Sequence, residues 1–183
     1  MDESKPDTSM SPGSGNMNLG NRKELEDFFE KLSINVVTVE HPEVFTVEAM
    51  LPYVQQLNGA VSKNLFLKDK KKKGLWLLTA RHEITVNLSD LAKQVGAPGG
   101  FRFADESLLK EALGVGQGCV TPFAVFNDKE QKVKLLVDSD FVNGGHERIY
   151  GHPMVNSATI GITPEDLMKF WEATGHKPIL VNL

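Results

Sequence analysis

Two nearly continuous apolar runs, residues 65–67 and 75–80, stand on either side of the lysine-rich segment 68–74. Short apolar runs separated by charged residues and a glycine are typical of two strands joined by a turn. The runs are apolar enough for both strands to be buried. This pattern predicts a β-hairpin with a basic tip, so the middle of the chain is expected to form part of a β-sheet.

The rest of the chain mixes helical and extended patterns. From Arg22, apolar residues recur at Leu25, Phe28, Phe29 and Leu32, which is the spacing of an amphipathic helix. Further helices are expected over 47–57, 89–95, 105–113 and 164–173, with caps at Thr46, Ser89, Asp105 and Thr163. Strands are expected over 36–39, 124–126, 133–137 and 157–162, the second and third forming a hairpin through 127–129. This irregular mixture predicts an α+β fold with a mixed, largely antiparallel sheet and peripheral helices.

Composition sets the size and setting of the domain. With 183 residues, 40% of them hydrophobic, the chain has the size of one globular domain. Residues 1–21 are mostly Ser, Gly, Pro, Asn, Asp and Met, so we expect a disordered tail there and one domain over 22–183. A single cysteine, no apolar leader and no run of 18 apolar residues favour a cytoplasmic protein with no membrane partner.

The loop 114–122 holds three glycines, Gly114, Gly116 and Gly118, and ends at Pro122. Glycine allows another molecule to approach the main chain closely, and proline fixes the backbone beside it. Such a loop can line a site with backbone N–H groups. A connecting turn without a further role is the alternative for a segment of this composition.

Three side chains are candidates for a site, each with a structural alternative. Lys63, at the start of an apolar strand, must either extend to water or meet an anionic partner. Asn64 beside it can bind a ligand or only satisfy the backbone at the strand entrance. His152 precedes Pro153 and can orient a polar substrate group or transfer a proton, or it can be an ordinary loop residue.

The net charge of −4 excludes a generally basic nucleic-acid binder but allows a local basic patch. The concentrated positive patch consists of Lys68, Lys70, Lys71, Lys72 and Lys73. These lysines can solubilise a turn or contact phosphates of a nucleic acid. The histidines and Cys119 show no metal-ligand spacing, and the glycine loop lacks the Lys-Ser/Thr of a P-loop, so we expect neither a metal nor a cofactor.

Several motifs in order resemble the YbaK/prolyl-tRNA synthetase-associated editing domain, in particular its freestanding Ala-tRNA(Pro) deacylase branch. The resemblance covers about residues 22–183. The segments that carry it are 40–48 (EHPEVFTVE), 63–69 (KNLFLKD), 113–123 (LGVGQGCVTPF), 151–153 (GHP) and 175–178 (GHKP).

The resemblance implies hydrolysis of the ester that joins a wrong amino acid, alanine in this branch, to the 3′ end of proline tRNA. It implies that the loop from Gly118 through Cys119, Val120 and Thr121 to Pro122 holds the aminoacyl carbonyl with its amides. It also implies that Lys63 engages the terminal adenosine or its phosphate, that His152 shapes the space for the amino-acid side chain, and that a ribose hydroxyl of the substrate helps to activate water. The basic tip is then expected to approach the tRNA acceptor stem.

Two rival functions remain. The chain can be a module that binds an aminoacyl end, or prolyl-tRNA synthetase, without hydrolysis. It can also deacylate another small amino acid, serine or cysteine, on a different tRNA. Cys119 departs from the alanine or serine expected at its position, and we interpret it as a small spacer rather than a nucleophile.

Overall fold

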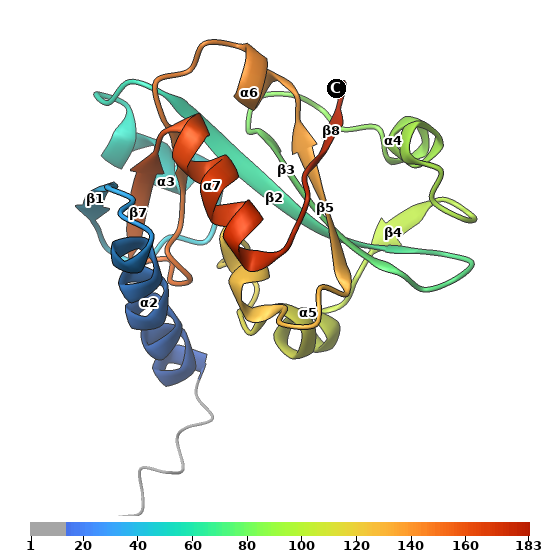
Figure 1. Ribbon diagram of the computed structural model, residues 1–183, viewed down its shortest axis with the longest axis horizontal. Helices are drawn as coiled ribbons and strands as arrows, with labels where there is room; N and C mark the ends of the chain where they lie inside the picture. Colours follow the sequence, from blue (N-terminus) through green and yellow to red (C-terminus); the bar gives the residue numbers. More distant parts are fainter. Residues whose placement is uncertain (1–13) are drawn as a thin grey trace, which may run out of the picture.

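The computed structural model describes residues 14–183, whose centre is one mixed sheet (Figure 1). Its strands follow the order β1-β7-β6-β2-β3-β5-β8, and β4 pairs with β2 beside this path. The strands are β1 (Val37–Glu40), β2 (Ala60–Asp69), β3 (Leu75–Arg81), β4 (Phe101–Phe103), β5 (Val133–Asp138), β6 (Ile149–Gly151), β7 (Ala158–Ile162) and β8 (Ile179–Val181).

The predicted hairpin is confirmed as β2 and β3, which pair antiparallel at the centre of the sheet. The buried carboxylate of Asp69 holds the turn between them, because it accepts hydrogen bonds from the backbone N–H groups of Lys72 and Gly74 and from the indole of Trp76. These bonds lower the pKa of Asp69 despite the opposing effect of burial, so the carboxylate stays ionised. The basic tip is therefore a structured turn.

The α+β fold with a mixed sheet is also confirmed. Antiparallel pairs join β1 to β7, β2 to β3, β2 to β4 and β6 to β7. Parallel pairs join β2 to β6, β3 to β5 and β5 to β8. The parallel neighbours require long connections, and these carry most of the helices.

The expected hairpin of 124–126 with 133–137 is wrong. Residues Ala124–Asn127 form a short 3-10 helix, η1, and β5 pairs with β3 and β8 instead. The bonds of η1 run from Ala124 N to Thr121 O and from Phe126 N to Phe123 O. A short run that is apolar on all sides does not distinguish a strand from a buried helical turn.

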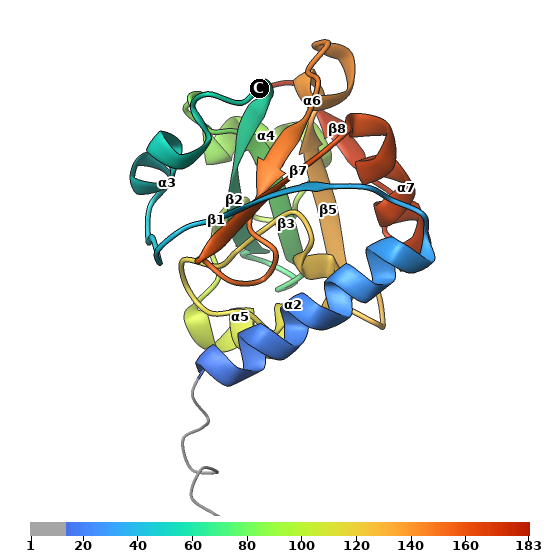
Figure 2. The ribbon, with the colours of Figure 1, turned by 90° about the vertical axis from the view of Figure 1, so that its left-hand side faces the viewer.

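Helices cover both faces of the sheet (Figures 1 and 2). On one face, α2 (Ser14–Lys31), α5 (Glu106–Leu113), η1 and α7 (Pro164–Thr174) pack their apolar side chains into the larger core. On the other face, α4 (Leu88–Val95) covers Leu67, Trp76 and Leu78. A smaller cluster joins α3 (Val47–Val54) to Val61 and Tyr150, and α6 (Asp140–Asn143) follows β5.

Helix starts follow the sequence signals closely, with two corrections. The caps at Thr46, Asp105 and Thr163 are confirmed, each accepting a backbone N–H of the first turn. The cap of α4 is Asn87 rather than Ser89. The first helix begins at Ser14, inside the segment expected to be a disordered tail, while residues 1–13 lie outside the described part.

The early start of α2 has a physical reason. Its C-terminal half is anchored in the core by Leu25 and Phe29, and extending an existing helix costs far less than nucleating one. The side-chain amide of Asn21 adds a tertiary tie, because it donates to the carbonyl of Gly114 at 2.8 Å. Composition alone did not show this support.

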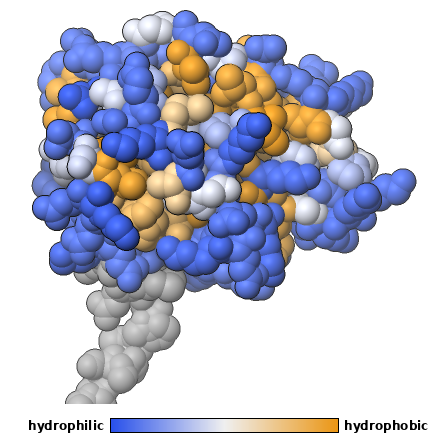
Figure 3. All heavy atoms as spheres, viewed as in Figure 1, coloured by the Kyte–Doolittle hydropathy of each residue, from blue (hydrophilic) through white to orange (hydrophobic). Residues whose placement is uncertain are grey.

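The face seen in Figure 1 is mainly hydrophilic, with apolar groups gathered in smaller patches (Figure 3). Within residues 14–183, no helix is long and apolar enough to cross a membrane.

Candidate functional site

A cavity of about 250 Å³ opens between the start of α3, the first half of β2, the glycine loop and the end of β6. Five residues singled out from the sequence line it, namely Lys63, Asn64, Gly118, Val120 and His152. They come from three segments that are far apart in the chain. The remaining wall consists of Phe45, Thr46, Val47, Met50, Ser62, Gln117 and Gly151.

The glycine loop contributes Gln117, Gly118 and Val120 to the lining of this cavity. Gly118 has a φ of +87°, in the left-handed region that glycine adopts without strain. Within the described residues, the backbone N–H groups of Gly118 and Val120 make no hydrogen bond, whereas Cys119 N donates inside the loop to Gly116 O at 3.0 Å. Among the described loop residues that line the cavity, Gly118 and Val120 are therefore the two whose amides have no hydrogen-bond partner.

The loop is held from behind by buried contacts. The indole N–H of Trp171 donates to Pro122 O at 2.9 Å, which ties the loop to α7. The hydroxyl of Thr121 donates to His152 O at 2.5 Å. Gly151 permits this close approach, because a Cβ there would lie 2.8 Å from Pro122 Cδ. The loop and the His152 segment therefore form one packed unit.

Cys119 and Thr121 do not line the cavity, although the resemblance assigned the whole loop to substrate. Cys119 is 5% exposed and Thr121 is fully buried. Burial raises the pKa of the Cys119 thiol, and a hydrogen bond from the backbone of Asn156 offsets this only in part. The geometry therefore gives both residues a supporting place behind the cavity wall.

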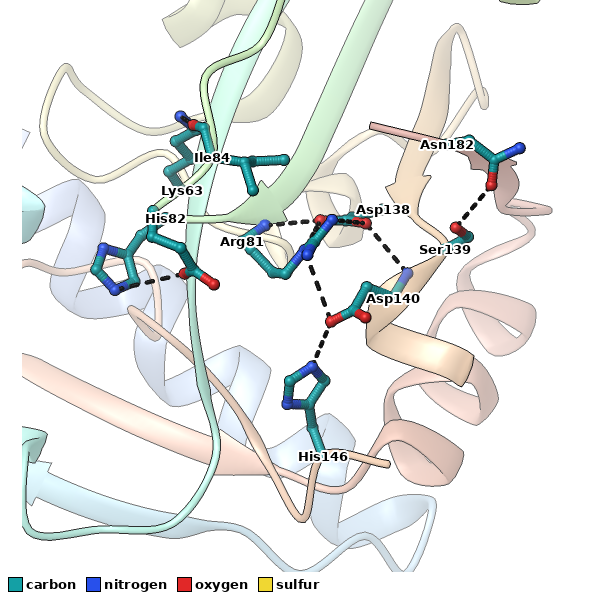
Figure 4. Close-up of polar contacts among 10 residues, drawn as sticks. Lys63, Arg81, His82, Ile84, Asp138, Ser139, Asp140, His146 and Asn182 are labelled. Atoms are coloured by element: carbon teal, nitrogen blue, oxygen red, sulfur yellow. Dashed lines mark hydrogen bonds and ion pairs between the residues drawn. The ribbon is translucent and has the colours of Figure 1, made fainter. Parts of the chain in front are cut away.

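Lys63 lies on β2, opposite Ala80 of β3. Its ammonium donates to the carbonyl of Ile84, in the loop that follows β3 (Figure 4). The sequence left open whether this lysine extends to water or meets an anion, and the structure gives it a backbone carbonyl instead. An ammonium carries three N–H donors, so this contact leaves donors for a ligand.

Asn64 is only half satisfied. Its side-chain NH₂ donates to Ser62 Oγ at 3.3 Å, while its buried Oδ1 has no hydrogen-bond partner within the described residues. The hydroxyl of Thr79, opposite Asn64 on β3, is buried and lacks a partner in the same way. Unpaired buried polar atoms are costly and rare in native proteins, and a role at a functional site is one reason for which they persist.

His152 is oriented by β7. Its Nδ1 lies 2.7 Å from Ala158 O. Burial is the main cause that lowers the pKa of His152, and the nearby His41 lowers it further, against the raising effect of the Ala158 contact. The imidazole is therefore neutral at neutral pH, and it faces the cavity as a polar but uncharged group.

Sequence reasoning missed the apolar wall at the start of α3, formed by Phe45, Val47 and Met50. Phe45 is 70% exposed and stands next to Gly118, since a Cβ on that glycine would lie 3.4 Å from Phe45 Cδ1. The signal was present, because the segment 40–48 carries part of the family resemblance, but nothing in the pattern assigned these side chains to a pocket.

A charged cluster lies beside the cavity, at the ends of β3 and β5. Arg81 Nε lies 2.7 Å from Asp138 Oδ2 and 3.6 Å from Asp140 Oδ2, and His146 contacts Asp140 (Figure 4). The hydrogen bond from His146 is the main cause that lowers the pKa of Asp140. This cluster joins two parallel strands to α6. Nowhere in residues 14–183 do three or more His, Cys, Asp or Glu side chains group as a metal site.

The basic tip lies away from the cavity. Lys68 follows Lys63 by five residues along β2, which corresponds to about 17 Å in a strand. The side chains of Lys70, Lys71, Lys72 and Lys73 are exposed at the turn beyond it, on the opposite side of the molecule from α3 (Figure 1). Arg102 of β4, which pairs with Lys68, adds a cation that the sequence did not group with them.

Comparisons with known proteins agree with this geometry. A family model described as the aminoacyl-tRNA editing domain matches residues 41–170. Prolyl-tRNA synthetase associated domain-containing protein 1 of Bos taurus is 56% identical over 162 residues, which cover 88% of this chain and 94% of that protein. Prolyl-tRNA editing protein ProX of Acetoanaerobium sticklandii is 33% identical over 147 residues, covering 80% of this chain and 88% of that protein.

The fold itself recurs in solved structures. One described as a candidate trans-editing enzyme for prolyl-tRNA synthetase matches with a TM-score of 0.67 at 20% identity, over 89% of this chain and 97% of the other. At this identity the likeness concerns the fold alone. The family match spans the cavity, the glycine loop and His152, and the relatives cover most of the described chain. The chain therefore belongs to the aminoacyl-tRNA editing domain family.

Proposed function

We propose that this protein is a trans-editing hydrolase that removes alanine from mischarged proline tRNA. The observation that carries the proposal is the meeting of Lys63, Gly118 and His152 in the lining of one cavity. Membership in the editing domain family and the relative named as a prolyl-tRNA editing protein support the reaction class.

The glycine loop performs the electrostatic part of the reaction. Water attacks the ester carbonyl carbon, the carbonyl oxygen gains negative charge, and the Gly118 and Val120 amides stabilise that oxygen. The C–O bond to the ribose then breaks, and the ribose oxygen takes up a proton, which releases alanine and tRNA. One correctly placed oxyanion donor is worth about 100- to 1000-fold in rate.

Lys63 positions the tRNA end. Its ammonium donates to the terminal adenosine or its phosphate, either in place of the Ile84 carbonyl or in addition to it, and this contact fixes the ester against the loop. A ribose hydroxyl of the substrate assists the attacking water. This is consistent with His152 Nδ1 being held by a backbone carbonyl and with Cys119 being buried behind the cavity wall. An activated ester in a fixed geometry does not need a covalent nucleophile.

The cavity favours a small amino acid. Its apolar wall at the start of α3, formed by Phe45, Val47 and Met50, faces the position of the side chain. Pocket contacts with one or two extra methylenes change binding by only about 1 to 3 kcal/mol, so rejection of proline rests on exclusion by shape. Serine and cysteine are close to alanine in size and are the competing substrates.

The test is the release of labelled alanine from Ala-tRNA(Pro), with Ser-, Cys- and Pro-charged tRNAs assayed in parallel. Wild-type protein is expected to hydrolyse the alanyl ester fastest. Lys63→Ala is expected to abolish turnover, while Lys93→Ala, an exposed lysine on α4, leaves it unchanged. Near wild-type turnover by folded Lys63→Ala removes this lysine from the site.

The rival function is a module that binds an aminoacyl-tRNA end or prolyl-tRNA synthetase without hydrolysis. The same cavity residues, Lys63 among them, can hold a charged tRNA end without hydrolysing it. This rival function is supported if the protein binds the charged tRNA or the synthetase but hydrolyses the ester no faster than buffer does.

A further inference from the structure

Behind His152 lies a second histidine, His41, joined to it through one hydroxyl group. His41 Nε2 lies 2.9 Å from Thr159 Oγ1, and Thr159 Oγ1 lies 3.5 Å from His152 Nδ1. The two imidazole rings are 6.0 Å apart. Thr159 is fully buried on β7 and His41 is 7% exposed, so this row of polar groups is closed off from bulk water.

Backbone carbonyls determine where the protons of both rings lie. His41 Nδ1 is 2.8 Å from Pro42 O, and His152 Nδ1 is 2.7 Å from Ala158 O. A carbonyl oxygen only accepts, so both Nδ1 atoms carry the hydrogen. In neutral His41, Nε2 then holds a lone pair and accepts the hydroxyl hydrogen of Thr159. The oxygen of Thr159 consequently turns lone pairs, not its hydrogen, toward His152.

We propose that His41 and Thr159 are positioning residues that reinforce the Nδ1–H tautomer of His152 set by Ala158 O, and so leave its Nε2 lone pair free to accept a hydrogen bond from the substrate in the cavity. Within the described residues, His152 Nε2 has no hydrogen-bond partner, and His152 lines the cavity. The glycine loop thus offers donors and His152 offers an acceptor in one pocket. This assignment rests on the proposed function for its substrate.

The arrangement of His41 is rigid enough for this role. Its ring stacks on Tyr53 with centroids 4.9 Å apart and planes inclined by 19°. Its Nδ1 bond to Pro42 O and its contact with Thr159 use both ring nitrogens. Thr159 is placed by the antiparallel pairing of β7 with β1, where it lies opposite Val39. Two strands and α3 therefore fix the row independently of a ligand.

The tautomer can be measured on the free protein by ¹⁵N NMR of the histidine rings, in the full ¹⁵N-labelled chain. Wild type is expected to show His152 with Nε2 unprotonated. Thr159→Val removes one acceptor of the Nδ1 hydrogen and is expected to raise the fraction of the Nε2–H form. His41→Phe keeps a ring on Tyr53 but frees the Thr159 hydrogen to point at His152, so a larger rise is expected. Thr159→Ser retains the hydroxyl and is the matched control.

Activity on Ala-tRNA(Pro) is expected to follow the same order. The ratio kcat/KM falls about tenfold in Thr159→Val, further in His41→Phe, and stays near wild type in Thr159→Ser, as for other residues that orient a functional imidazole. Unchanged His152 tautomer in folded Thr159→Val and His41→Phe overturns the proposal. If wild type does not hydrolyse the ester but the tautomer responds as expected, the positioning role stands and the proposed function fails.

Discussion

Cys119 shows how the surroundings of a residue decide its chemistry. A cysteine in a catalytic loop suggests a nucleophile, but this thiol is 5% exposed and burial raises its pKa. A buried, protonated thiol is a poor nucleophile. We predict that Cys119→Ala keeps the proposed deacylation within about twofold of wild type, because the amides proposed to act are those of Gly118 and Val120. A decrease comparable to that of Lys63→Ala, measured by alanine release, contradicts the spacer role.

The lowered pKa of His152 leads us to predict how the stability of the protein depends on pH. In the unfolded chain this histidine protonates near its ordinary value of about 6.5, whereas burial in the folded chain lowers the pKa. Between these two values the unfolded state binds more protons. Neutral His152 therefore makes its full contribution to the free energy of unfolding when the pH is above the ordinary pKa of histidine. This contribution is lost as the pH falls from the ordinary pKa to the lowered pKa of the folded state.

Denaturant unfolding of wild type and His152→Gln, from about pH 7.5 to about pH 5, measures this contribution. Wild type is expected to lose more stability on acidification than the variant, since glutamine does not titrate. Parallel pH profiles of the two proteins would show that burial of His152 contributes nothing to the pH dependence.

At the scale of the element, the glycine loop offers two glycines, Gly118 and Gly116, at which the same substitution to alanine is expected to have different effects. Gly118 has a φ of +87°, which strains any L side chain, and a Cβ there would contact Phe45 Cδ1 at 3.4 Å. Gly116 has no such φ, and the nearest atom to its Cβ would be Glu106 Oε2 at 3.9 Å. Gly118→Ala is expected to cost about 1–3 kcal/mol of backbone strain.

The same substitution displaces a proposed oxyanion donor, so we predict that Gly118→Ala lowers kcat about 100-fold. Gly116→Ala is expected to retain activity. Steady-state kinetics with alanyl-tRNA, alongside thermal denaturation, separate the two effects. Equal activity in both variants would show that the amide of Gly118 is not used.

The GHKP segment has a structural role at the end of α7. His176 Nε2 lies 2.8 Å from Asp128 Oδ2, and its Nδ1 lies 2.9 Å from Thr174 Oγ1. Both His176 and Asp128 are buried, and the Asp128 carboxylate also accepts the backbone N–H groups of Lys132 and Val133. These hydrogen bonds attach the exit of α7 to the turn before β5, away from the cavity.

We predict that His176→Ala lowers the free energy of unfolding by about 2 kcal/mol, because it removes a hydrogen bond to a buried carboxylate and leaves Asp128 only its backbone donors. Chemical denaturation measures this decrease. Catalysis at a temperature where the variant is folded is expected to match wild type. His82→Ala, in the turn after β3, is the control and should change stability little.

Elements differ in how well sequence predicts them. Thr46, Asp105 and Thr163 mark helix starts correctly because a cap is a contact within one turn of helix. The segment 124–126 is expected from its pattern to be a strand and is the 3-10 helix η1. Its conformation depends on the proline and the buried neighbours around it, and no local periodicity encodes them.

At the scale of the whole molecule, the basic tip and the cavity lie near opposite ends of β2. A tRNA acceptor arm reaches both only if it lies along the hairpin. We predict that changing Lys70, Lys71, Lys72 and Lys73 to Gln raises KM for charged tRNA and leaves kcat unchanged. The salt dependence of binding is also expected to weaken, by about 0.7–0.9 in the log–log slope for each phosphate that the tip no longer neutralises.

A control of equal net charge is available in this chain. Lys23, Lys31, Lys93 and Lys132 are exposed elsewhere on the surface, and their replacement by Gln gives the same change in charge. If this control raises KM and flattens the salt slope as much as the tip variant does, the effect comes from overall charge, and the tip has no specific role in binding tRNA.

The sequence by itself determined the fold class, the central hairpin and most helix starts, because apolar periodicity, caps and turn residues act over a few positions. The candidate residues Lys63, Gly118 and His152 were singled out by the ordered motifs that resemble the editing domain family. Only the tertiary structure decided the parallel pairings, the apolar wall at the start of α3, the contact of Lys63 with Ile84 and the row from His41 to His152. These depend on interactions between residues far apart in the chain, where the energy comes from mutual burial and hydrogen bonding that no local pattern specifies.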